Sequence, residues 1–123
     1  MASPVTQPLP EYPSGVQRGA SAHVCIEFVI DENGAVASAT PLYGLHECPA
    51  AQDELDTRFV DSAVEAASRW QFLAAAICTF PEGGEATDDC SGDEVVVTTV
   101  AIKLAYVFTF QGGGRVTAVA RRA

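Results

Sequence analysis

Two histidine–cysteine pairs with the same spacing are the residues of this chain best suited to chemistry. One residue separates His23 from Cys25, and one residue separates His46 from Cys48. Imidazole nitrogens and thiolate sulfurs are the ligands of structural zinc sites, so these four side chains could together enclose a metal ion. Neither pair has the usual Cys-x-x-Cys spacing, and the second pair falls in an expected loop. We therefore expect no metal and no cofactor.

Disulfide bonds explain the cysteines more simply than a metal does. Four cysteines allow three pairings, and an even count is typical of proteins from oxidising compartments. Cys25 with Cys48 would tie the first predicted strand to the loop after the second. Cys78 with Cys90 would close an acidic loop and stabilise the fold by about 3 kcal/mol. We favour these two disulfides.

The motifs of common enzyme active sites are missing from the sequence. It contains no Gly-x-Ser-x-Gly elbow, no His-Glu-x-x-His helix and no glycine-rich phosphate loop. A histidine could join a cysteine as a nucleophilic pair, but a surface histidine beside a disulfide accounts for the same residues. The sequence therefore indicates a protein that is not an enzyme.

The chain is short and acidic. Its 123 residues carry 16 acidic and 7 basic side chains, which gives a formal net charge of −9. Such a charge disfavours binding to nucleic acid or to anionic lipid, because both need lysine and arginine. Most carboxylates fall between residues 47 and 65 or between 82 and 94, where we expect solvated surfaces. The run Asp88–Glu94 lacks the regular ligand spacing of a calcium loop.

The length predicts one domain, and nothing in the sequence predicts a membrane span. No run of 18 apolar residues occurs, and the first residues lack the basic and apolar regions of a signal peptide. The chain is therefore either cytosolic or a domain excised from an exported protein. We favour the exported domain, with residues 1–21 as an extended, proline-containing lead-in.

Alternating side chains predict a β-hairpin after this lead-in. Apolar and polar residues alternate over Ala22–Ile30, with Ile26 and Phe28 on the core face. Asp31–Gly34 is a strong turn signal, and a weaker strand over Ala35–Tyr43 follows it.

A helix follows the hairpin. Phe59, Ala63 and Trp70 recur at helical spacing and form one apolar stripe, which we expect to pack on the hairpin. Asp53 or Asp56 is expected to cap the N-terminus of this helix.

The last predicted element is a long strand over Val95–Phe110, which is rich in β-branched and aromatic residues. Gly112–Gly114 then breaks the chain, and we expect a flexible or weakly structured tail over residues 111–123, in which Arg115–Ala123 is either a short extra strand or a frayed end. The order is β-β-α-β. It predicts a small α+β domain over residues 22–110, in which one helix packs on one face of a three-stranded antiparallel sheet.

Several short motifs recur in a characteristic order along the chain. They are Tyr12-Pro13, the turn from Asp31 to Gly34, Phe59 within the helix, and Trp70 and Phe72 at its end. In this order they resemble the C-terminal domain of TonB-family energy transducers. The resemblance spans Pro10–Phe110. The chain departs from the family at Ala22, where glycine is usual, at Ala74, where proline is usual, and in its long acidic loop.

The resemblance implies a periplasmic, non-enzymatic protein-binding domain that is anchored to the inner membrane. In the family, such a domain couples inner-membrane energy to an outer-membrane transporter by pairing the transporter's "TonB box" peptide with its final strand. Carried over, the peptide-binding residues are Thr98, Val100, Ile102, Lys103, Leu104, Tyr106 and Phe108. The implied partners are the TonB-dependent transporter and, through an N-terminal anchor, inner-membrane motor proteins.

Two further interpretations stay open beside the resemblance. The long final strand could be swapped between two copies in a homodimer, or its edge could be covered by the chain's own tail. The domain could also be a sensor or scaffold attached to a larger membrane protein. A peptide-binding domain predicts a monomer with affinity for extended peptides, whereas self-association predicts a dimer at low concentration.

Overall fold

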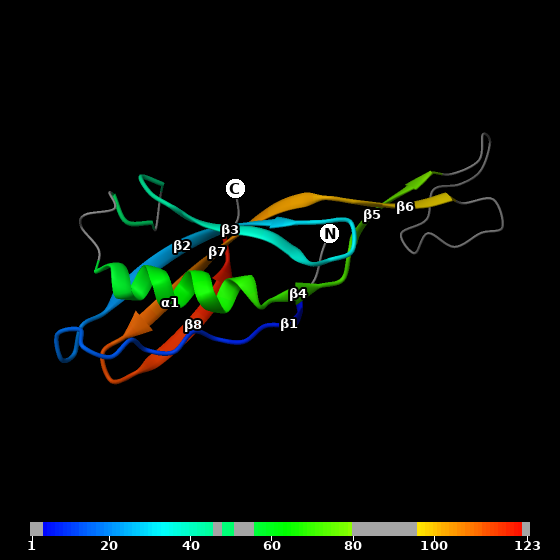
Figure 1. Ribbon diagram of the computed structural model, residues 1–123. Helices are drawn as coiled ribbons and strands as arrows, with labels where there is room; N and C mark the ends of the chain where they lie inside the picture. The colour runs from blue at the N-terminus through cyan, green and yellow to red at the C-terminus, as the bar shows by residue number, and fades with distance from the viewer. Residues whose placement is uncertain (1–3, 46–47, 51–55, 80–95, 122–123) are drawn as a thin grey trace.

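A computed structural model describes residues 4–45, 48–50, 56–79 and 96–121. Within them the chain is an α+β fold of antiparallel strands and one helix (Figure 1). The elements are β1 (Pro4–Thr6), β2 (Ala22–Ile30), β3 (Val36–Leu42), α1 (Thr57–Ser68), β4 (Gln71–Phe72), β5 (Ala75–Thr79), β6 (Val96–Val100), β7 (Ile102–Gln111) and β8 (Arg115–Ala120). The predicted fold class is confirmed, although the strands form three sheets rather than one.

The largest sheet has the strand order β3-β2-β7-β8. β2 pairs with β7 along its whole length, from Ala22 opposite Phe110 to Ile30 opposite Ile102. The strand predicted over residues 95–110 is divided, because β6 pairs with β5 whereas β7 pairs with β2. The predicted three-stranded sheet therefore gains a fourth strand, β8, from the segment expected to be a weakly structured tail.

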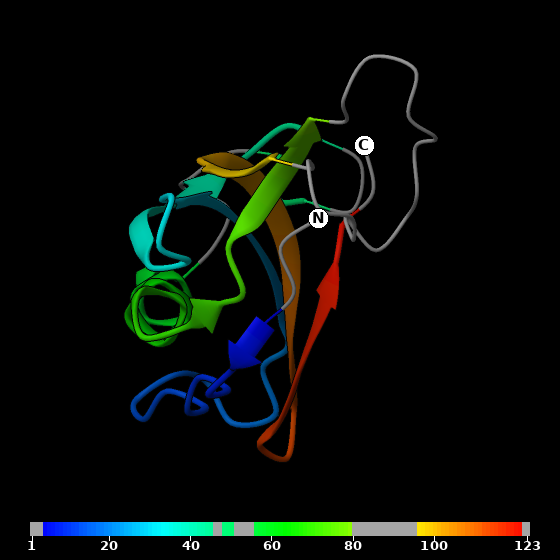
Figure 2. The same cartoon turned by 90° about the vertical axis from the view of Figure 1, so that its right-hand side faces the viewer.

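Of the two smaller sheets, one lies beside the C-terminal end of α1 and the other projects from one end of the molecule (Figure 1). β1 pairs with β4, and β5 pairs with β6 in a two-stranded ribbon that projects beyond the large sheet (Figure 1). On one face of the large sheet, α1 packs against β2 and β3 (Figure 2). The opposite face of that sheet is not covered by a helix of the described chain.

The helix is positioned by its cap and by its small apolar residues. Asp56 is the N-cap, and its carboxylate accepts the backbone N–H of Arg58 at 2.9 Å. The predicted stripe is confirmed, since Phe59, Ala63 and Ala67 are buried against the sheet. Alanine side chains let the helix backbone approach the strands closely, and this leaves room for the large aromatic rings of the core.

The predicted turn after β2 also holds β4 in place. The Asp31 carboxylate accepts the backbone N–H groups of Asn33 at 2.9 Å and Ala35 at 3.0 Å. Gly34 has a φ of +86°, and its carbonyl oxygen accepts the N–H of Phe72 at 2.9 Å. A Cβ atom on Gly34 would lie 2.0 Å from the carbonyl oxygen of Phe72. Only glycine fits this contact between the hairpin and β4.

We expect Gly34→Ala to lower the free energy of unfolding by about 2–3 kcal/mol, because a strained φ and a backbone clash act together. Gly19→Ala is the matched control, since Gly19 has a similar φ of +79° but open space around the added methyl group. The control should cost only the conformational strain, about 1 kcal/mol. Urea unfolding of both variants measures the difference, and equal losses would show that the contact with β4 contributes nothing.

Candidate peptide-binding edge

β7 is an interior strand, which corrects the expectation that it forms the open edge. β2 lies along one side of β7, and β8 covers the other side from Tyr106 to Gln111. Thr98 and Val100 belong to β6 and pair with β5. Tyr106 and Phe108 are buried in the core, where they cannot contact a peptide. The chain's own C-terminal segment therefore occupies most of the edge that the family resemblance assigns to a partner.

Burial also changes the chemistry of one of these residues. The loss of water around the phenol of Tyr106 raises its pKa above the ordinary value of 10.0. The ring is therefore neutral at physiological pH and acts as part of the apolar core, together with Phe108 and Phe28.

The other expected residues of the peptide site are Ile102, Lys103 and Leu104, which lie beyond the end of β8. Arg121, just after β8, donates its backbone N–H to the carbonyl oxygen of Ala105 at 2.7 Å. Because backbone groups alternate between the two sides of a strand, Lys103 directs its N–H and C=O to the same side as Ala105. No strand of the described chain pairs with Lys103 on that side.

β8 is an open edge of the large sheet within the described chain. The hydrogen bond from Arg121 to Ala105 fixes which residues of β8 face β7 and which face away. The residues that direct N–H and C=O groups away from the sheet are Val116, Ala118 and Ala120. Among the residues that the structure describes, no strand pairs with these groups.

The side chains of β8 leave this edge accessible while the core holds the strand in place. Val116 lies opposite Phe110 and Ala118 lies opposite Phe108, and both pack against the core. On the other face of the sheet, Val119 is 65% exposed. No proline and no charged residue stands between Arg115 and Arg121, so the edge lacks the usual features that block strand addition.

β3, at the other end of the sheet, is less suited to strand addition. Pro41 lies within it and has no N–H to donate. The segment after β3 closes on itself, because Gly44 donates its N–H to the carbonyl oxygen of Pro49 at 2.8 Å. Of the two outer strands, β8 therefore has the more regular row of outward backbone groups.

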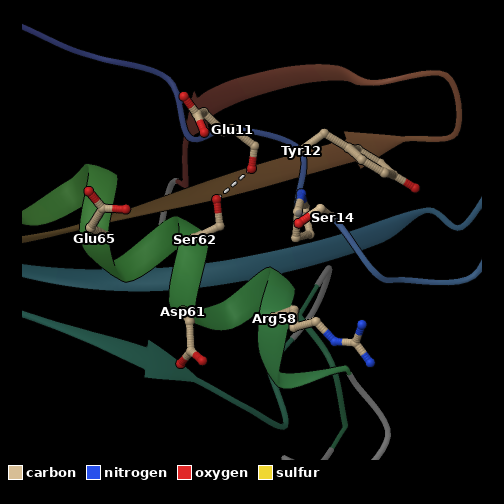
Figure 3. A pocket seen from close by; sticks show the side chains of 8 residues that line it. Glu11, Tyr12, Ser14, Arg58, Asp61, Ser62 and Glu65 are labelled. Carbon is tan, nitrogen blue, oxygen red and sulfur yellow. Dashed lines mark hydrogen bonds between the residues drawn. The ribbon is translucent and has the colours of Figure 1, made fainter.

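The Tyr-Pro motif lies across α1 and fastens the lead-in to the core. The rings of Tyr12 and Phe59 meet edge to face with their centroids 5.7 Å apart, and the Tyr12 hydroxyl donates to the carbonyl oxygen of Ala20. Ser62 donates its hydroxyl to the carbonyl oxygen of Glu11 (Figure 3). These contacts give the motif a structural role in the described fold.

A hollow separates this segment from α1 and is lined by residues that include Pro13, Arg58, Asp61 and Glu65 (Figure 3). Asp61 and Glu65 are exposed to solvent. Within the described residues no buried polar side chain lacks a hydrogen-bond partner. The carboxylates that line the hollow are therefore solvated side chains.

The structure confirms the disulfide predicted between the first strand and the loop after the second. Cys25 and Cys48 form a disulfide with their Cα atoms 5.5 Å apart, which removes both sulfurs from the zinc site considered above. Cys78 is also disulfide-bonded, whereas Cys90 and His46 lie outside the described residues. His23 is within hydrogen-bond distance of the Thr109 hydroxyl, with Nδ1 and Oγ1 3.1 Å apart.

The sequence left open whether the tail forms a short extra strand or a frayed end, and the structure has a strand there, β8 over Arg115–Ala120. Val116 and Ala118 alternate with polar Arg115 and Thr117, but the run is short and follows three glycines. Its strand conformation comes from pairing with β7, which no local pattern reveals.

The described residues thus present an open sheet edge at β8 and a solvent-exposed hollow beside α1. No protein-family model matches the chain, and neither does a curated protein or a solved structure. In the part of the chain that the structure describes, no helix is long and apolar enough to cross a lipid bilayer.

Proposed function

We propose that this chain is a non-enzymatic, TonB-like protein-binding domain that receives an extended peptide on the outer edge of β8. The observation that carries the proposal is the row of outward backbone groups at Val116, Ala118 and Ala120 on a strand with no charge or proline between its ends. The peptide would come from an outer-membrane transporter. The domain would couple that transporter to inner-membrane motor proteins through an N-terminal anchor.

Three observations support this role. The motifs of the sequence occur in the order typical of TonB C-terminal domains. The edge belongs to a sheet whose other strands are fixed by a buried aromatic core, so a bound strand would meet a preorganised surface. The Cys25–Cys48 disulfide is compatible with an oxidising compartment such as the periplasm.

The resemblance assigns peptide binding to the strand that is β7 here. We assign it instead to β8, the next strand outward in the sheet. Lys103 stays beside this edge, because β8 ends before it and its backbone groups face the same side. A peptide that extends past Arg121 and bends inward toward β7 would reach Lys103. The residues proposed to contact the peptide are therefore Val116, Ala118, Ala120 and Lys103.

Replacing Ala118 with proline tests this assignment. Ala118→Pro removes one outward N–H and places a ring in the path of an added strand, while the hydrogen bonds of β8 to β7 come from its neighbours. We expect peptide affinity to fall about tenfold, which corresponds to one or two lost backbone hydrogen bonds. Nitrogen-15 NMR titration with peptides from outer-membrane transporter plugs measures the affinity and locates the bound peptide.

Two control variants separate binding from folding. Ala118→Val keeps the N–H and should bind peptide as the unmodified chain does. Thr117→Pro removes an N–H that faces β7, so it should lower stability. Unchanged binding by Ala118→Pro, or peptide-induced shifts confined to β3, would refute the assignment to β8.

A further inference from the structure

A second hollow, the outer hollow, adjoins β8 and has a volume of about 430 Å³. It is lined by His23, Val107, Thr109, Val119 and Ala120. We propose that the outer hollow receives an aromatic side chain of the peptide that pairs with β8. This inference rests on the proposed function, and it specifies one residue of the peptide that the edge accepts.

The outer hollow lies on the face of the large sheet that is turned away from α1. Val107 and Thr109 flank the buried Phe108 on β7, and successive side chains of a strand point to opposite faces. Val119 stands opposite Val107 and His23 stands opposite Thr109, and residues opposite each other in paired strands share a face. No helix of the described chain covers this face (Figure 2).

The walls of the outer hollow are in place before any peptide binds. They come from β2 and β7, which are interior strands of the sheet, and from β8. His23 Nδ1 lies 3.1 Å from Thr109 Oγ1, and this hydrogen bond restrains the imidazole ring. Val119, by contrast, is 65% exposed, and no described strand lies on its outer side. A side chain that covers Val119 would therefore gain apolar contact at little cost in ordering the protein.

The pairing of β8 determines which residue of the peptide reaches the outer hollow. Val119 directs its backbone groups toward β7, because its neighbours Ala118 and Ala120 direct theirs outward. A residue opposite Val119 on an added antiparallel strand therefore belongs to a non-hydrogen-bonded pair. The Cα atoms of such pairs are about 4.5 Å apart, and their side chains approach most closely. This peptide residue points to the outer face and lies directly beside the outer hollow.

The lining of the outer hollow favours an aromatic side chain. Val107 lies two strand spacings from the peptide, about 10 Å across the sheet. Aromatic and long side chains reach beyond the residue directly opposite, whereas a threonine would contact Val119 alone. An aromatic ring that extends across Val119 would meet Val107 and the imidazole ring of His23. The described residues of the lining include no carboxylate, ammonium or guanidinium group, so a charged side chain would gain no ion pair there.

Three nine-residue peptides test the inference. Each consists of threonine with lysine at positions 2 and 8, and they differ only at position 5, which is phenylalanine, leucine or threonine. We expect the phenylalanine peptide to bind about fivefold more tightly than the threonine peptide, since an aromatic–β-branched cross-strand pair is added. The leucine peptide should lie between them. Nitrogen-15 NMR titration gives each Kd, and nuclear Overhauser effects from the phenylalanine ring to the methyl groups of Val107 and Val119 locate the ring.

Two variants of the protein complete the test. Val119→Thr keeps the β-branched shape but removes apolar surface, so it should abolish most of the preference for phenylalanine. Val29→Thr is the matched control, because Val29 lies on the same face of β2 as His23 but outside the lining of the outer hollow. This control should keep the preference.

Three results would overturn the inference. Binding of the threonine or leucine peptide at β8 as tightly as the phenylalanine peptide would do so and leave the proposed function standing. No binding of any peptide would overturn both. A dimer in which a second copy covers Val119 would identify that copy as the occupant instead.

Discussion

Replacing Trp70 with alanine is expected to lower the free energy of unfolding by about 3–5 kcal/mol. Trp70 is 1% exposed, and its ring centroid lies 4.9 Å from that of Tyr106, 5.1 Å from that of Phe28 and 5.5 Å from that of Phe108. Its indole N–H also donates to the carbonyl oxygen of Pro8 at 2.9 Å. The substitution removes the ring that joins the helix end, the sheet and the lead-in.

Trp70→Phe separates packing from hydrogen bonding. Phenylalanine keeps most of the apolar volume and loses the bond to Pro8, so we expect a loss of about 1–3 kcal/mol. Urea unfolding of both variants should be monitored by circular dichroism. Tryptophan fluorescence is not usable, because the chain has one tryptophan and both substitutions remove it. The phenylalanine variant remains informative if the alanine variant does not fold. A loss below about 1 kcal/mol for alanine would contradict the central position of this ring.

Removing the Cys25–Cys48 disulfide is expected to cost about 3 kcal/mol. The bond joins residues 23 positions apart and ties β2 to the segment after β3. Without it, the unfolded chain gains the entropy that the closed loop had lost. Alanine is the suitable replacement at both positions, since Cys25 is fully buried and a serine would bury a hydroxyl group there.

Thermal and urea unfolding of the Cys25→Ala/Cys48→Ala double variant measures this cost. The unmodified protein should lose at least as much stability when a reductant is added, because Cys78 is also disulfide-bonded. An unfolding free energy within about 1 kcal/mol of the unmodified protein would show that the native contacts alone fix the segment after β3.

The elements with strong local signals could be predicted from the sequence. Strict alternation located β2, the acidic turn ending in Gly34 located the hairpin, and helical spacing from Phe59 located α1. Asp56 was one of two expected caps, and its side chain performs that role. In each case the local preference and the tertiary packing agree, which is why the pattern was sufficient.

The edge of the sheet could not be predicted in the same way. Residues 95–110 are uniformly β-prone, so nothing in their sequence shows that strand pairing changes from β5 to β2 near Ala101. β8 is a six-residue segment after three glycines, and it forms a strand because its backbone pairs with β7. The candidate site therefore depends on a long-range pairing that sequence periodicity does not encode.

The path of the lead-in also determines how the domain would respond to mechanical load. Its carbonyl groups at Pro8 and Glu11 are bonded to Trp70 and Ser62, and Tyr12 is seated against the helix. A pull on the N-terminal side would therefore strain the pairing of β1 with β4 and then these contacts, before any force reached β2. β8 is separated from β3 by two strands, β2 and β7, and lies outside this path. Force applied through the lead-in would therefore move the domain together with a peptide bound at the β8 edge. It would not act directly on the hydrogen bonds between that peptide and β8.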